Sequence, residues 1–212
     1  MDKSLSKALA VAAVVAFLWP AGSDAMGKEK DELNAGRAGN WRSGVQGAPS
    51  LEAAQKKAKE NPNDAEAQND LGWAMRQNGD VKGAEEHLRE SIRLNGALPY
   101  SHSNLSVVLL DTGRAAEALA EAKRAVELDA KAPIYHVVLG NSLSANADRK
   151  GAIDQYREAI RLRPDYENAL YNLGRVLNED GQTNDAKLAL SQALELDPKD
   201  DRVLKLLDQI MQ

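Results

Sequence analysis

The stretch that decides the fold runs from Pro133 to Pro164 and reads PIYHVVLGNSLSANADRKGAIDQYREAIRLRP. Its pattern recurs on both sides at a constant separation, that between Leu105 and Leu139, which we call the repeat step. Further leucines keep this step, namely Leu71, Leu173 and Leu207. The alanine at position 152 has equivalents at Ala84, Ala118 and Ala186. A step this regular, kept without an insertion, indicates one supersecondary unit copied in tandem.

Each copy predicts a pair of helices that cannot fold alone. Leucine and alanine at helical spacing give each helix one apolar stripe, and small residues such as Gly140 let two helices approach closely. A single pair leaves its stripe exposed, whereas stacked pairs cover one another. The sequence therefore predicts an all-α solenoid of antiparallel helix pairs.

The turn inside each pair has its own signals. Glycine occupies this turn in three copies, at Gly79, Gly113 and Gly181. Glycine adopts the left-handed conformation that follows a helix at little cost. Ala147 stands at the equivalent place in the third copy, so we expect that turn to be strained. Asp80 and Asp148 are placed to cap the helices that follow.

The quoted stretch resembles the tetratricopeptide repeat (TPR) family, whose unit is about 34 residues long. The residues that carry the resemblance are Leu139, Gly140, Leu143, Ala152, Tyr156, Ala159 and Pro164. The family implies a right-handed TPR superhelical solenoid, with full repeats at residues 65–98, 99–132, 133–166 and 167–200. An incomplete repeat helix at 49–64 would precede them, and a capping helix at 201–212 would follow. Ser106 departs from the pattern, because it replaces the glycine in the second copy.

Residues 1–25 are typical of an export signal, with Lys3 and Lys7 before an apolar run at residues 8–19. Small residues before Ala25 predict cleavage after it, although an uncleaved anchor formed by the apolar run stays an alternative. Either way we expect periplasmic or secreted repeats, or repeats held outside the cytoplasm at the inner membrane. No cysteine follows the run, so no lipid anchor is expected. Residues 26–48, glycine-rich and polar, predict a flexible linker that contains Trp41.

Composition disfavours several classes of function. The formal net charge is −5, which disfavours nucleic-acid binding, because neutralising phosphates needs a basic face. The chain has no cysteine and no phosphate-binding or hydrolase motif, so we expect neither a cofactor nor catalysis. His102 and His136 are one repeat step apart and occupy equivalent sites. We favour a structural role for both, with a histidine-based metal site as the alternative.

The resemblance implies that the first helix of each repeat lines a concave groove. The residues that we expect to bind a partner there are Asn69, Trp73, Arg76, Tyr100, Asn104, Asn141, Asn168, Tyr171, Asn172, Arg175, Arg202 and Lys205. Asparagine can both donate to and accept from the backbone of an extended peptide, and tryptophan and tyrosine dominate binding hot spots. Acidic residues begin the groove and basic residues end it, which predicts an acidic stretch or a terminal carboxylate over the late end.

The sequence thus predicts a non-catalytic adaptor of the bacterial cell envelope that binds a peptide segment or a partner protein. A self-assembling structural scaffold is one alternative. An accessory subunit or enzyme with a metal at the two histidines is another.

Overall fold

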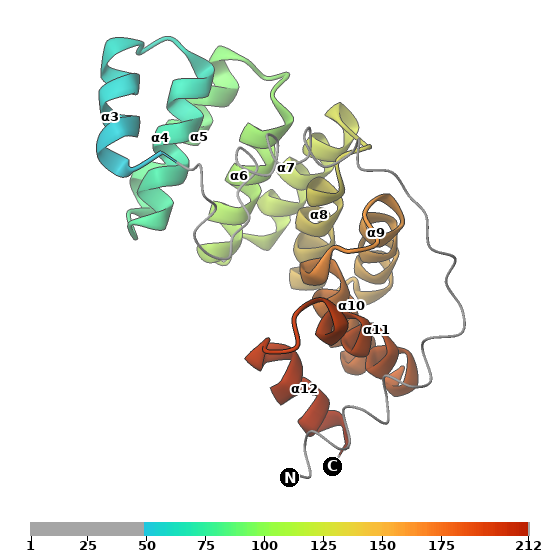
Figure 1. The fold of residues 1–212 in the computed structure, drawn as a ribbon. Helices are drawn as coiled ribbons and strands as arrows, with labels where there is room; N and C mark the ends of the chain where they lie inside the picture. Colours follow the sequence, from blue (N-terminus) through green and yellow to red (C-terminus); the bar gives the residue numbers. More distant parts are fainter. Residues whose placement is uncertain (1–48, 212) are drawn as a thin grey trace. The chain divides into compact units, whose positions relative to one another are not determined.

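The structure is a computed structural model that describes residues 49–211, and every regular element within this range is a helix (Figure 1). The helices are α3 (Leu51–Glu60), α4 (Ala65–Gln77), α5 (Val81–Leu94), α6 (Pro99–Asp111), α7 (Ala115–Leu128), α8 (Pro133–Ala145), α9 (Arg149–Leu162), α10 (Glu167–Glu179), α11 (Thr183–Leu196) and α12 (Asp201–Met211). None of these helices is both long and apolar enough to span a membrane. The predicted export signal at 1–25 and linker at 26–48 lie outside the described residues.

The helices pack in consecutive pairs, which confirms the predicted all-α class. α4 packs with α5, α6 with α7, α8 with α9 and α10 with α11. The first helices of these pairs begin at Ala65, Pro99, Pro133 and Glu167, and α12 begins at Asp201, so the repeat step is kept throughout. Whether the solenoid winds right-handed concerns its overall shape and stays a prediction.

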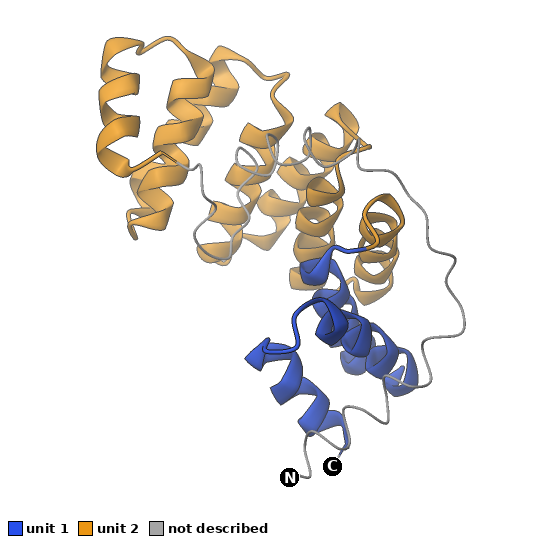
Figure 2. Cartoon of the chain, viewed as in Figure 1, with its two compact units in different colours: residues 1–27, 165–212 blue, residues 28–164 orange. Residues whose placement is uncertain are grey.

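The chain divides into two compact units (Figure 2). Of the described residues, 49–164 belong to one unit and 165–211 to the other. We call the helices α3 to α9 the N-terminal unit and the helices α10 to α12 the C-terminal unit, and we describe each by itself.

Glycine permits the close approach of paired helices. A Cβ atom added at Gly72 would lie 2.8 Å from Leu88 Cγ, and one at Gly140 would lie 2.6 Å from Tyr156 Cε1. Both separations are too short for real atoms, so a side chain there would push the two helices apart. Ser106, the exception in the second copy, fits because its hydroxyl donates a hydrogen bond to the carbonyl of Ala118 at 2.8 Å.

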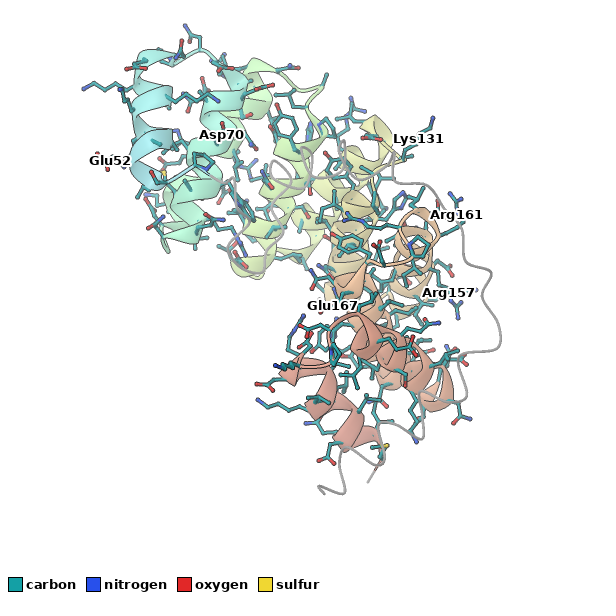
Figure 3. The ribbon with its side chains drawn as sticks, in the orientation of Figure 1. Glu52, Asp70, Lys131, Arg157, Arg161 and Glu167 are labelled. Carbon is teal, nitrogen blue, oxygen red and sulfur yellow. The ribbon has the colours of Figure 1, made fainter. Side chains whose placement is uncertain are left out.

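Buried side chains join each pair to the next. In the N-terminal unit α3 packs through Ala54 and Ala58 on Leu71 of α4. Leu88 of α5 packs in one cluster with Leu105 of α6. Polar contacts add to this packing, since Lys57 of α3 reaches Asp70 of α4, which Figure 3 labels, at 2.7 Å. The lone helix α3 is therefore an integral part of the array.

Arg114, the residue before α7, forms ion pairs with Glu85 of α5 and Glu117 of α7. Its guanidinium lies 2.7 Å from Glu85 of α5, which also binds Arg89. Burial by itself raises the pKa of Glu85, but the hydrogen bonds from the two arginines outweigh it and hold that pKa below its ordinary value. A carboxyl whose pKa is lowered by folding stabilises the fold at neutral pH, and this contribution is lost as the pH falls through the folded-state pKa.

The turns behave as their residues predict. Gly79, Gly113 and Gly181 have φ values of +85°, +74° and +80°, and Ala147 has a φ of +63°. A residue with a Cβ is strained in this left-handed region, so the expected strain of the third turn is confirmed. Asp80 and Asp148 accept hydrogen bonds from the backbone N–H groups of Gly83 and Gly151, both at 2.9 Å, and cap α5 and α9 as predicted.

We expect Ala147→Gly to raise the free energy of unfolding by about 0.5–1 kcal/mol, because it removes the strain of the left-handed turn. Gly113→Ala is the matched reverse change, since an added Cβ there has no neighbour within 4 Å and meets only backbone strain. It should lower the free energy of unfolding by a similar amount. Urea denaturation followed by circular dichroism measures both, and two changes of the same sign would contradict the interpretation.

Candidate functional site

The N-terminal unit contains six of the predicted partner-binding residues, and four of them are buried. Asn69, Trp73, Tyr100 and Asn104 each expose 6% of their surface or less. The side-chain amide of Asn104 donates a hydrogen bond to Asn69 Oδ1 at 2.9 Å. All four side chains are therefore buried rather than open to solvent, and their role in binding a partner stays a prediction.

Trp73 is buried in the core of the N-terminal unit. It belongs to an apolar cluster of α4, α6, α7 and α8 whose other buried members are Val107, Ala122, Val138 and Leu139. Arg76 covers its ring, with the guanidinium carbon 4.9 Å from the ring centroid. The same arginine forms an ion pair with Asp111 of α6 at 2.6 Å.

Asn141 is the remaining predicted residue of the N-terminal unit, and it is half-buried. Its Oδ1 atom accepts a hydrogen bond from the hydroxyl of Tyr156 at 2.7 Å. Asn141 therefore anchors α8 to its paired helix α9. The polar groups of Asn141 and Arg76 thus both bond to other residues of the N-terminal unit.

The C-terminal unit has an open recess between α10 and α12 of about 500 Å³. Its lining residues are Tyr171, Arg175, Asn178, Glu179, Arg202, Lys205, Leu206 and Gln209. Four of the predicted residues thus come together here, two from each helix. None of the eight is fully buried.

Arg202 organises this recess. Its guanidinium carbon stacks over the ring of Tyr171, 4.6 Å from the centroid. It also forms ion pairs with Glu167, labelled at the start of α10 in Figure 3, at 2.8 Å and with Asp200 at 2.6 Å. A weaker contact of 3.5 Å reaches Asn168. These contacts hold the ring of Tyr171 in place as one wall of the recess.

The other two cationic side chains of the recess differ in whether they form an ion pair. Arg175 forms an ion pair with Glu179, one turn further along α10. Lys205 is exposed, and within residues 49–211 it makes no hydrogen bond or ion pair. Lys205 is therefore the charge that an incoming anionic group can pair with at the lowest cost, since no existing bond must be broken.

Asn172, the last of the predicted residues, lies beside this recess in sequence. It is only 4% exposed, and its Nδ2 atom has no hydrogen-bond partner among the described residues. A buried amide donor without an acceptor costs about 1–3 kcal/mol. The side chain therefore has an unsatisfied hydrogen-bond donor among the described residues.

Four lining residues were not among the partner-binding residues predicted above: Asn178, Glu179, Leu206 and Gln209. The repeat itself carries the signal for two of them. Gln209 stands one repeat step after Arg175, and Leu206 stands one repeat step after Asn172. The register that places residues on the inner face of the full repeats therefore applies to the capping helix over its whole length.

Comparison with known proteins defines the family. Models of the tetratricopeptide repeat match residues 34–101, 99–124 and 143–210. The chain is a tetratricopeptide repeat protein. A search of curated protein sequences found no match.

Solved TPR structures share the fold. A thermophilic TPR protein in Thermus thermophilus is 21% identical, with a TM-score of 0.68 over 76% of this chain and 88% of that one. YrrB, described as a TPR protein with an unusual peptide-binding site, is 20% identical, with a TM-score of 0.62 over 74% and 81%. MamA is 22% identical, with a TM-score of 0.61 over 70% and 87%.

Both candidate histidines sit inside their TPR helix pairs. His102 Nδ1 lies 2.6 Å from Glu121 Oε2, and His136 Nδ1 lies 2.9 Å from Gln155 Oε1. The second ring nitrogen of each lies within hydrogen-bond distance of a loop carbonyl, that of Gly96 for His102 and that of Ala130 for His136. Residues 49–211 contain no group of three or more side chains that could hold a metal ion. These contacts join the two helices within repeat two and the two helices within repeat three.

We expect Asn172→Val to leave the free energy of unfolding unchanged or to raise it by about 1 kcal/mol, because it removes a buried donor that has no acceptor. The third repeat has valine at the equivalent position, Val138, where it is fully buried. Thermal and urea denaturation measure the effect. A loss of about 2 kcal/mol or more would mean that the amide already has a partner that stabilises the fold.

Proposed function

We propose that this TPR protein is a non-catalytic adaptor that holds a peptide segment or a partner protein. The observation that carries the proposal is the recess between α10 and α12, where four predicted partner-binding residues converge. A volume of about 500 Å³ accommodates a few side chains of a bound segment.

The chemistry of the recess favours an acidic segment or a C-terminal carboxylate. Lys205 is unpaired within the described residues. Arg175 is paired only with Glu179, and an incoming carboxylate can replace that partner. An incoming carboxylate gains charge-assisted hydrogen bonds from both. The ring of Tyr171, held by Arg202, offers flat apolar area beside these charges, as hot spots of binding do.

Amide groups supply the remaining recognition. Asn178 and Gln209 line the recess, and each can both donate to and accept from a peptide backbone whatever its sequence. YrrB, which has a peptide-binding site on the same fold, supports this kind of ligand. A single extended segment held in this way binds with a dissociation constant of about 1 μM.

We further propose that the protein acts in the bacterial cell envelope, in the periplasm or attached to the outer side of the inner membrane. The support is the sequence of residues 1–25, with two lysines before an apolar run of a dozen residues and small residues before Ala25. An adaptor placed there would hold one envelope protein while another is assembled with it.

The recess is tested with peptides selected for binding from a random library displayed with free C-termini. We expect the selected peptides to be acidic near the C-terminus, and we expect Arg175→Glu combined with Lys205→Glu to weaken their binding at least tenfold. The salt dependence of the affinity should also flatten, because the screened attraction is gone. Fluorescence anisotropy measures both quantities.

A matched control changes the same net charge elsewhere. Arg149 and Lys150 of α9 are exposed and, within the described residues, form no ion pair. Arg149→Glu combined with Lys150→Glu should leave the affinity within about twofold of the wild type. Equal losses for the two double variants would show that only overall charge matters and would remove the recess from the proposal.

The location is tested separately with the full chain produced in a bacterium. We expect the repeats in the periplasmic fraction, and a mature chain that begins at Met26 if the signal is cleaved. Mass spectrometry of the purified protein reports the N-terminus. Repeats found only with the cytoplasmic marker proteins would contradict the envelope proposal and leave the adaptor proposal standing.

A further inference from the structure

The helix α12 is the first helix of a pair whose second helix is missing from the described residues. It begins one repeat step after α10 and packs on α11, with Val203 fully buried. On another side it carries Leu204 and Met211, which are 39% and 44% exposed, with the exposed Asp208 between them. An exposed apolar pair at this spacing, on a helix whose equivalents are all paired, indicates a face that is built to be covered.

The full repeats show what covers this face. The equivalents of Leu204 and Asp208 in the first repeat are Gln68 and Gly72. Gln68 Oε1 lies 2.7 Å from His87 Nδ1 of α5, and the site of Gly72 adjoins Leu88 of the same helix.

The equivalent of Met211 follows the same rule. It is Met75, whose terminal methyl lies 2.9 Å from where a Cβ on Gly83 of α5 would be. In the first repeat, then, these three positions face the second helix of the same pair.

The helix α3 is the complementary case, a second helix with no first helix of its own among the described residues. Its face toward α4 is buried through Ala54 and Ala58. Ala53 stands one repeat step before His87 and is exposed. Pro49 stands one repeat step before Gly83 and is partly exposed. Within the described range, the array thus has half a pair at each end, and the two halves are of opposite kinds.

We propose that α12 of one copy packs against α3 of a second copy, so that the two half-pairs complete one repeat. In this register Leu204 lies against Ala53. The fourth repeat has the same pair of residue types at the equivalent positions, Leu170 and Ala189, and buries both. Met211 lies against Pro49, which continues the apolar contact to the start of α3.

The charge of Asp208 agrees with this occupant. It stands where three repeats have glycine, opposite a large side chain such as Leu88 or Tyr156. The equivalent of these large side chains in α3 is Ala54, which is small and already buried against α4, so it leaves more room for Asp208. Its carboxylate also lies at the first turn of α3, where the positive end of the helix dipole stabilises an anion.

The interface joins two different surfaces, so it is heterologous, and each copy has one of each surface. Chains therefore add head to tail, and the mean mass rises with concentration. One helix pair buries less surface than a standard protein interface, so the association is weak and reversible. This self-association does not depend on the peptide-binding proposal, and either can fail alone.

The test is the mass of the full chain by sedimentation velocity and light scattering between about 1 and 300 μM. We expect the wild type to rise from monomer toward larger species over this range. Leu204→Glu and Ala53→Glu, each at an exposed site, should each leave the protein monomeric. Leu188→Glu on α11 is the matched control, because Leu188 is 50% exposed and lies outside the proposed contact, so it should behave as the wild type.

Mixing the two variants gives the sharpest result. The Leu204→Glu protein keeps an intact α3, and the Ala53→Glu protein keeps an intact α12. Equal amounts should form a one-to-one dimer through these two surfaces and nothing larger, because the two changed surfaces carry like charge. A wild type that stays monomeric at the highest concentration, a Leu188→Glu variant that also loses association, or a mixture without dimer would each overturn the proposal.

Discussion

The structure depends on how closely the two helices of each pair approach at one position. Gly72, Gly140 and Gly174 meet the side chain of a facing leucine or tyrosine at distances that leave no room for a methyl group. This contact sets the separation within a pair, and the separation decides which apolar side chains remain to bury against the next pair. The stability of the array is therefore a sum of pair and neighbour terms, each renewed at every repeat step.

The same periodicity makes the two ends of the described array special. Each of the helices α4 to α11 has a paired helix, whereas α3 and α12 have none of their own among the described residues. The recess beside Tyr171 and the open apolar face of α12 both arise from this lack, on different sides of one helix. The proposed binding of a peptide and the proposed association of copies therefore use separate surfaces of α12 and need not compete.

Much of the fold could be predicted from the sequence, because the leucine and glycine positions report directly on helix packing. The strain at Ala147 and the caps at Asp80 and Asp148 followed from single residues in known turn positions. The candidate site was harder. The register assigns Asn69 and Asn104 to the inner face, but it does not show that their amides bind each other. Such a contact depends on the spacing of neighbouring first helices, which sequence alone does not contain.

The alanine in the third turn has a consequence for how the array loses its structure. Solenoids whose repeats have equal stability fray from their ends, where each terminal unit has only one neighbour. Because the left-handed backbone of Ala147 weakens an internal joint, thermal fluctuations that separate α8 from α9 cost less than in a uniform array. Amide protons around that joint would then exchange with solvent earlier than those of the flanking hairpins, and a protease would find its first cut in the interior.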